Sequence, residues 1–390
     1  MSDSNRGRLS YNRKLTSAIA TGALQTVNML NESFAGTKQT AQDDTIREDG
    51  NENGLIMLDM QGSGGFTAEF GPDWHDDFFE AALRSVYDTP VSISEITLSI
   101  TAGTPATLDD SGSGLAVLEV GDIVWIAGFT TAANNGACFV SAVAAGSISV
   151  IPLDPTQTMV TEAAGDSVTI KTTRMMNANA NNFFDFEKLF GDLSNVYHTY
   201  LNQQLNTLTV EFGAGAKVAF SVGFIGDKHN TAAATIGSSY VAQATSKALN
   251  PENHFLGSLV GNNGAAVAPV GSCVTKIAIT ITNTARRTKG LSDVCFGKGS
   301  FNVQVNLDMM FENNDHYEQF VSHNEVAIAT GIADASGNGY GFHFPKLEYA
   351  DAKVNISGKN ADVPQTFQAT ASWKLVGAET YTMKICKLSQ

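Results

Sequence analysis

Hydrophobic and polar residues alternate with strict period two from Phe301 to Met309. Such alternation predicts a strand with one apolar face and one wet face. The segment that follows, Asn313 to Val321, predicts a short helix with Tyr317 and Phe320 on one side together with Val321. This helix is expected to cover the apolar face of the strand.

The same unit occurs earlier in the chain. A strand pattern from Phe66 to Phe70 precedes a helical pattern from Asp73 to Tyr87, and residues 218–224 and 367–375 alternate in the same way. We therefore predict a mainly β protein with short helices and two copies of one half-open sheet, at residues 15–90 plus 173–226 and at 273–390. Unpaired sheet edges favour aggregation, and closure into a barrel shared between subunits would remove them.

The remaining segments differ from these repeats in residue composition and in the pattern of apolar residues. Short β-like runs separated by turn signals at 91–172 predict a small all-β inserted module. The polar residues 1–14 predict an N-terminal arm, the polar residues 36–54 a long exposed loop, and the small and polar residues 227–272 a linker between the halves.

Composition limits the possible functions. The formal net charge of −15 argues against static nucleic-acid binding, which needs Lys and Arg to neutralise phosphates, but not against a surface past which nucleic acid slides. The four cysteines, Cys138, Cys273, Cys295 and Cys386, form no CxxC pair and are expected to be reduced and mostly buried. No transmembrane helix and no signal peptide are expected.

No residue pattern supports an enzyme. His75, Asp76 and Asp77 fit the start of a helix, with Asp73 as its N-cap, better than a metal site or a base–acid pair. The acidic loop at 43–52 lacks the ligand spacing of an EF-hand. We predict no catalytic residues, no metal site and no cofactor.

Several segments resemble the tail tube proteins, or major tail proteins, of long-tailed, non-contractile bacteriophages (siphophages). The matching segments are the hairpin at 326–349 with its Asp-x-x-Gly-Asn turn, the helix at 76–83, the strands at 184–188 and 205–208, and the loop motif at 46–49. The resemblance covers roughly residues 24–90 and 175–377. This chain has Gly50 where the family has a second arginine.

The resemblance implies tube-type β-sandwich or half-barrel repeats that close into an intermolecular β-barrel. Trimeric, pseudo-hexameric rings would stack into a DNA-conducting tail tube for genome ejection, without a contractile sheath. The implied partners are other copies of the chain, the tape measure protein and viral dsDNA in the lumen, and tail terminator and distal tail proteins at the ends, with no membrane. Assembly would occur in the host cytoplasm, and the mature protein would be part of the virion.

Two groups of site residues follow as hypotheses. The polar strand faces would line the lumen, through Thr67, Glu69, Ser221, Asn302, Gln304, Asn306, Gln368, Thr370 and Ser372. The 36–54 loop would reach the next ring, through Asp43, Asp44, Ile46, Arg47, Glu48 and Asp49. The inserted module would lie on the outer surface, because a module of its size would block the lumen. Alternatives are another phage tail, head or decoration protein, a secreted β-modular bacterial adhesin and a carbohydrate-active enzyme.

Overall fold

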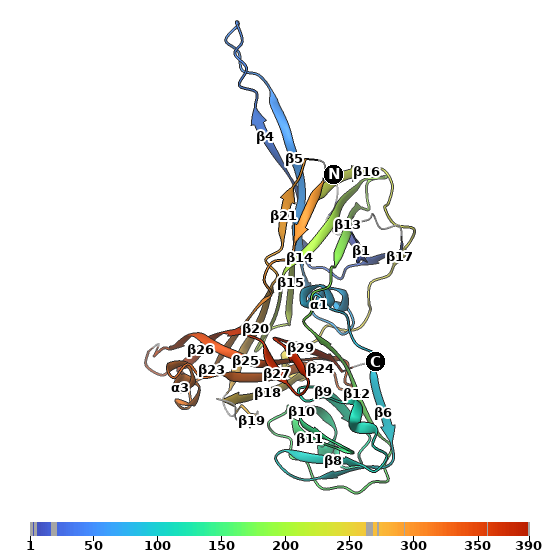
Figure 1. Ribbon diagram of the computed structural model, residues 1–390, viewed down its shortest axis with the longest axis vertical. Coiled ribbons are helices and arrows are strands. Elements are labelled where there is room, and N and C mark those ends of the chain that lie inside the picture. The colour runs from blue at the N-terminus through green and yellow to red at the C-terminus, as the bar shows by residue number, and fades with distance from the viewer. Residues whose placement is uncertain are drawn as a thin grey trace.

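The computed structural model describes residues 3, 6–16, 22–262, 268–270, 273–291, 293–356 and 358–388. The fold is mainly β with short α-helices, as the alternating pattern predicts (Figure 1). Its largest feature is a row of antiparallel strands that continues from the first half of the chain into the second. In order across the sheet, the strands are β4 (Ala35–Gln42), β5 (Leu55–Glu69), β15 (Ala219–Ile225), β14 (Tyr197–Gly213), β20 (Val274–Thr282), β23 (Asn302–Met310), β26 (Pro364–Ala371) and β25 (Gly339–Val354).

The two halves share one topology. In the first half, β5 leads into helix α1 (Asp76–Leu83), and β15 later pairs with β5 on one side and with the long strand β14 on the other. In the second half, β23 leads into helix α3 (Asp315–Val321), and β26 pairs with β23 and with the long strand β25. The two halves thus repeat one order of strands and helix, and the β14–β20 pairing joins them.

A second layer of strands packs over each copy. The first layer contains β1 (Gly7–Lys14), β2 (Leu24–Thr26), β13 (Phe183–Phe190), β16 (Lys228–Ala232) and β17 (Tyr240–Val241), with β3 (Asn31–Glu32) on the edge of β5. The other contains β18 (Phe255–Asn262), β19 (Ala268–Pro269), β24 (Val326–Ala333) and β29 (Lys384–Lys387), beside helix α2 (Pro251–His254). Two further hairpins are β21 (Arg286–Lys289) with β22 (Val294–Gly297), and β27 (Lys374–Val376) with β28 (Glu379–Tyr381).

Aromatic side chains fill the space between the layers of the first copy. Phe220 lies at the centre of this cluster, and the His75 ring stacks on it at 3.8 Å between ring centroids. Phe78 and Phe79 of α1 pack against the same ring. Such fully buried rings contribute most of the apolar area that holds a helix on a sheet. Burial lowers the pKa of His75 to about 4, because the charged imidazolium would lose its hydration there.

We expect acid to weaken the fold before its carboxylates titrate. Burial also lowers the pKa of His343, to about 3, so both histidines stay neutral in the folded chain as the unfolded chain takes up protons below about pH 6.5. The stability that they contribute is complete above that pH and is lost as the pH falls, by roughly 1.4 kcal/mol per pH unit per histidine down to the folded pKa values. Urea unfolding of the soluble subunit between pH 6.5 and 4.5 measures this slope. His75→Phe retains a ring against Phe220 but removes one titrating group, so the dependence of the unfolding free energy on pH should become less steep by roughly 1.4 kcal/mol per pH unit. An unchanged slope would show that His75 does not contribute to it.

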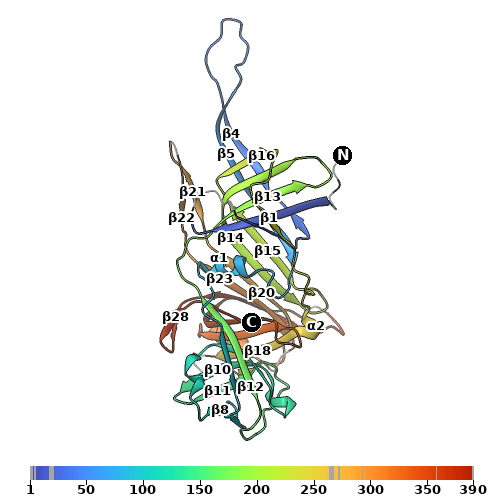
Figure 2. The ribbon, with the colours of Figure 1, turned by 90° about the vertical axis from the view of Figure 1, so that its right-hand side faces the viewer.

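The inserted module has its own core. Its strands are β6 (Val91–Glu95), β7 (Leu98–Thr101), β8 (Ala106–Asp110), β9 (Ile123–Ala127), β10 (Gly136–Ala144), β11 (Ser147–Pro152) and the first half of β12 (Val168–Met176). Their inward apolar side chains form a separate cluster. The second half of β12 leaves the module and pairs with β29, which places the module below the second repeat in Figure 2.

A buried ion pair and an apolar contact hold the module against the second repeat. Ile123, Phe139 and Leu153 of the module pack with Leu259 and Leu388. Beside them, the Lys384 ammonium lies 2.9 Å from the Asp122 carboxylate, and both side chains are inaccessible to solvent. Arg174 lies 3.0 Å from the same carboxylate. The module is thus inserted in the first repeat but packs on the second.

Lys384→Met should destabilise the subunit by about 3–5 kcal/mol, because it leaves the buried Asp122 carboxylate with a weaker set of partners. Urea denaturation of the soluble subunit measures the loss. Lys374→Met is the matched control, since Lys374 forms a half-exposed pair with Glu325 at 3.0 Å that is worth about 1 kcal/mol or less. Equal losses from the two variants would contradict a special role for the buried pair.

The predicted N-terminal arm is wrong for residues 7–14. They form β1, which pairs along its whole length with β13, and Leu9 is fully buried. The segment looks solvated in the sequence because it carries several charges. In the fold, Arg13 pairs with Asp77 and Glu80 of α1, and Lys14 pairs with the buried Asp185 at 2.6 Å. Of the rest of the arm, residues 1, 2, 4 and 5 lie outside the described residues.

The predicted loop and linker also contain regular structure. Residues 35–42 form β4, so only 43–54 connect the strands of a long hairpin. Residues 255–262, expected in a linker, form β18. This strand pairs with β24 and satisfies the backbone N–H and C=O groups along that edge of β24. The linker residues 263–267, 271 and 272 lie outside the described residues.

The helices are shorter than their patterns predict. Helix α1 ends at Leu83 because Arg84 adopts a left-handed conformation (φ 53°), and its N-cap is His75 instead of Asp73. Asp76 accepts hydrogen bonds from Tyr340 and Lys387, and so links α1 to the second repeat. In α3, Phe320 packs on the core, but Val321 is 68% exposed and does not cover the strand.

Candidate lumen face and docking hairpin

One face of the central sheet is polar from strand to strand. Directly opposite residues of an antiparallel pair lie on the same face. One row across the sheet consists of Thr67, Ser221, Thr209, Thr280, Gln304, Thr370 and Glu348. The next row consists of Glu69, Ala219, Glu211, Ala278, Asn306, Gln368 and Asp351. The opposite face carries the buried apolar side chains.

The structure brings the predicted lumen residues onto this one face, with Asn302 opposite Thr282 at the end of β23. Ser372 lies one residue beyond the end of β26, and its backbone N–H donates to the Lys346 carbonyl at 3.0 Å, which continues the β25–β26 register. Thr209, Thr280 and the acidic residues of both rows in β14 and β25 also lie on this face, although they are not among the predicted lumen residues. The signal was available, since polar residues alternate with Leu208, Val210 and Phe212 and with Ile277, Ile279 and Ile281.

Acidic and basic groups on the polar face largely neutralise one another. The ion pairs are Lys276–Glu211 (2.8 Å), Lys353–Asp351 (2.7 Å), Lys346–Glu348 (3.2 Å) and Lys217–Glu69. These side chains are partly exposed, so the pairs add little to stability. Their effect is on the electric field, because a face without excess positive charge offers phosphates no strong binding site.

A two-stranded hairpin projects far beyond the sheet. Strands β4 and β5 pair from Ala35 opposite Ser63 to Gln42 opposite Leu55, and the hairpin rises alone at the top of Figure 1. Four consecutive apolar residues of β5 are exposed on it, namely Leu55 (68%), Ile56 (52%), Met57 (61%) and Leu58 (54%). Because successive side chains point to opposite sides of a strand, β5 carries exposed apolar side chains on both faces of the hairpin, beside the mainly polar residues of β4.

The tip of the hairpin is polar and held by local hydrogen bonds. Asp43 accepts from the backbone N–H of Thr45, and the Arg47 guanidinium donates to Asp49 at 2.7 Å. Ile46 is the exception to this polarity, at 96% exposed. The predicted inter-ring residues Asp43, Asp44, Ile46, Arg47, Glu48 and Asp49 thus lie together at the far end of the molecule (Figure 2).

The base of the hairpin is tied to the second repeat. Arg287 of β21 lies 2.5 Å from Asp59 of β5, and both side chains are nearly buried. The hydrogen bond from Arg287 lowers the pKa of Asp59 to about 2. The hairpin therefore leaves the sheet from an anchored position, while its outer part is covered by nothing in the described residues.

The central sheet is open at both ends. Within the described residues, β4 pairs only with β5, and residues 348–354 of β25 pair only with β26. In the first repeat, the corresponding part of β14 pairs with β15 on one side and with β20 on the other. The open edge of β25 thus corresponds to the edge of β14 that pairs with β20 within the same chain.

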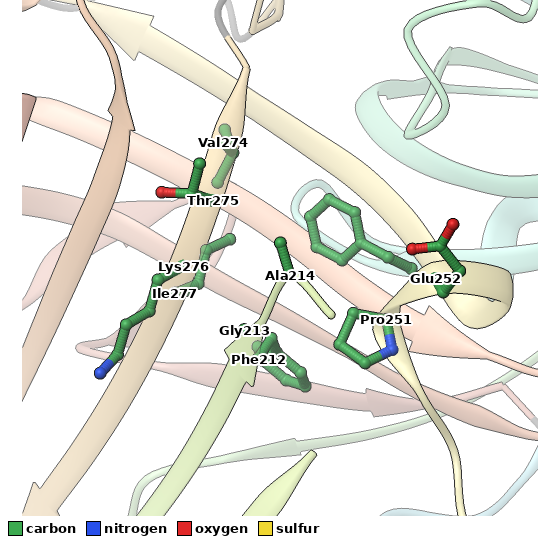
Figure 3. A pocket seen from close by; sticks show the side chains of 10 residues that line it. Phe212, Gly213, Ala214, Pro251, Glu252, Val274, Thr275, Lys276 and Ile277 are labelled. Atoms are coloured by element: carbon green, nitrogen blue, oxygen red, sulfur yellow. The ribbon is translucent and has the colours of Figure 1, made fainter. Parts of the chain in front are cut away.

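The described residues contain no group of three or more His, Cys, Asp or Glu side chains that could hold a metal ion. None of the helices in the described part of the chain is long and apolar enough to span a membrane. A cavity of about 210 Å³ lies between the end of β14, helix α2 and the start of β20 (Figure 3). Its lining groups do not form a catalytic arrangement of nucleophile and base.

Comparison with known proteins agrees with this geometry. Residues 4–373 match the model of a family described as phage tail tube protein. No curated protein matches the chain significantly. The family match spans the first repeat, the inserted module and the second repeat as far as residue 373, so it covers the polar rows, the hairpin and the open edges together. The chain belongs to the phage tail tube protein family.

Proposed function

We propose that this structural tail protein polymerises as stacked rings of three subunits and forms the DNA-conducting tube of a long, non-contractile tail. The observation that carries this proposal is the pair of equivalent repeats, joined side by side with both outer edges open. A chain with two equivalent units needs three copies to give a ring with six-fold pseudo-symmetry.

The internal β14–β20 junction supplies the template for ring closure. In the proposed ring, residues 348–354 of β25 pair with the first-repeat edge of the next subunit, as β14 pairs with β20 inside the chain. Three chains with eight strands each give a barrel of about 24 strands, wider than the 16–18-stranded porins that hold an aqueous channel. Duplex DNA fits such a bore.

The polar face would then line the lumen. Its near-neutral charge suits transient contact with viral dsDNA and with a tape measure protein, neither of which should adhere to the wall. Tail terminator and distal tail proteins would cap the two ends of the tube. Such a subunit would assemble in the host cytoplasm and act in the virion during genome ejection.

The hairpin would join successive rings. No other segment of the described part of the subunit covers the exposed apolar residues 55–58. Their burial against a neighbouring ring would stabilise the stacking of rings. The inserted module would lie on the outer surface. Its excision should leave tubes of unchanged bore, provided that Leu259 and Leu388, which pack against it, are also replaced by polar residues. A wider bore would contradict an outer position.

Electron microscopy of the purified protein tests the proposal. Tubes, or rings with three-fold symmetry and an open centre, are the expected result. Monodisperse monomers at high concentration, with the hairpin intact, would contradict it.

A further inference from the structure

The cavity at the junction of the two repeats has apolar walls and a charged rim. Phe212 and Ala214 at the end of β14 face Val274 and Ile277 of β20, and Pro251 and Glu252 of α2 close a third side (Figure 3). The backbone N–H of Ala214 donates to the Thr275 carbonyl at 2.9 Å, so the two strands stay paired at the cavity floor. The cavity is a preformed depression on the edge of the sheet.

This cavity and the hairpin tip lie at opposite ends of the same sheet. The first residue of β5, Leu55, adjoins the hairpin tip. Its last residue, Glu69, lies at the other end of the sheet and pairs with Ala219. Ala219 follows the turn that begins at Gly213, and Gly213 pairs with Lys276 at the cavity. When subunits stack in one direction, the tip of one ring therefore points toward the cavity end of the next ring.

The tip carries side chains that match the cavity. Ile46 is 96% exposed, although its neighbours are polar. Arg47 beside it is half-exposed, forms an ion pair with Asp49 and donates a long hydrogen bond to the Asn53 side chain at 3.5 Å. Across the stack, two charged residues line the cavity. Lys276 pairs with Glu211 at 2.8 Å, whereas Glu252 has no ion-pair partner in the part of the chain that the structure describes. An apolar group followed by a guanidinium fits an apolar cavity with a carboxylate on its rim.

We propose that Ile46 of one subunit inserts into the Phe212–Val274 cavity of a second copy in the adjacent ring, with Arg47 against Glu252. This inference rests on the proposed stacking of rings and names the acceptor surface for the hairpin. Leu291, between β21 and β22, is also fully exposed. However, the β21–β22 ribbon has only four residue pairs, so its end stays closer to its own sheet than the tip of the β4–β5 hairpin does.

A cysteine cross-link tests the contact directly. The background variant replaces the exposed Cys273 and Cys295 with serine, and leaves the buried Cys138 and Cys386 in place. Ile46→Cys and Val274→Cys are then added together. Mild oxidation of assembled tubes should give a ladder of covalently linked chains on a non-reducing gel, and the same oxidation of unassembled subunits should give monomers.

The control pair is Leu291→Cys with Val274→Cys. Tubes that form but cross-link only through this control pair, or through neither pair, would overturn the docking of Ile46 and leave the tube itself intact. Failure of the serine background to form any tube or ring would instead count against the proposed function. The two failures are therefore distinguishable.

A charge exchange tests the rim contact. Arg47→Glu or Glu252→Arg alone should raise the critical concentration for polymerisation. The two exchanges together should bring the critical concentration most of the way back to that of the unmodified chain. Ile46→Ser should raise it by roughly tenfold, since one apolar side chain loses its burial. Additive defects in the exchanged pair would show that Arg47 and Glu252 do not meet.

Discussion

Tubes should fail to form from a subunit whose hairpin ends at its base. The variant deletes residues 40–58 and joins Gln39 to Asp59 through Asn-Gly, a dipeptide that suits a two-residue hairpin turn. Gln39 and Asp59 are directly paired, so the shortened hairpin keeps its register and keeps the ion pair between Asp59 and Arg287. The predicted inter-ring loop is removed together with the exposed run at 55–58.

The expected loss is large because, among the described residues, the hairpin alone carries a run of four consecutive exposed large apolar side chains. Burying four half-exposed aliphatic side chains is worth on the order of 4 kcal/mol per subunit, which corresponds to a roughly 1,000-fold higher critical concentration. Sedimentation and electron microscopy measure polymerisation. Circular dichroism and urea unfolding should show an unchanged fold, because the deleted residues lie outside the core.

The matched control removes exposed apolar side chains elsewhere. Ile96 and Val160 of the inserted module are 64% and 48% exposed, and Ile96→Ser with Val160→Ser should leave polymerisation unchanged. Tubes of normal length from the shortened hairpin would remove its proposed role between rings. A defect of equal size in the control would show that surface hydrophobicity in general drives assembly.

DNA should stall in tubes whose polar face carries added lysines. Gln304 and Thr370 lie directly opposite each other on β23 and β26, and neither side chain is in the core. Gln304→Lys with Thr370→Lys adds six positive charges to each three-subunit ring, and the charges recur in every ring along the tube. Each phosphate contact adds about 0.9 to the salt slope of binding, so the retention should be strong at low salt.

Virions assembled with this variant measure the effect, through the rate of DNA release after triggering. We expect release to be at least tenfold slower at 50 mM salt and to recover as salt is raised. Gln304→Glu with Thr370→Glu keeps similar side-chain sizes and should release DNA normally. Slow release from both variants would indicate a packing defect, and normal release from the lysine variant would contradict a luminal position for this face.

The strand faces could be predicted from the sequence because alternation is local. Phe301 to Met309 and Val218 to Phe224 alternate strictly. The structure places residues 302–309 and 219–224 on the central sheet, where Val303, Val305 and Leu307 and the rings of Phe220 and Phe224 are buried. The fold class and the duplication follow from the same pattern. The polar face follows as well, since burying one face of a strand exposes the other.

Pairing between distant segments could not be read from local patterns. In the sequence, the charged residues of β1 are typical of a solvent-exposed segment. In the fold, Lys14 forms an ion pair with Asp185, and Arg13 forms one with Asp77. The module packs on the second repeat through Ile123 and the buried Lys384–Asp122 pair, although it is inserted in the first. The hairpin strand β4 has no apolar face of its own, so its polar residues resemble a loop.

The sequence by itself determined that two amphipathic half-sheets exist and which side of each strand avoids water, because side-chain polarity and period two decide both. Only the tertiary structure decided that the halves join through β14 and β20, that the outer edges of β4 and β25 stay open, and that the hairpin projects with both faces uncovered. These features depend on hydrogen bonds between residues far apart in the chain. Many partners satisfy the same local pattern, and the folded backbone selects one of them.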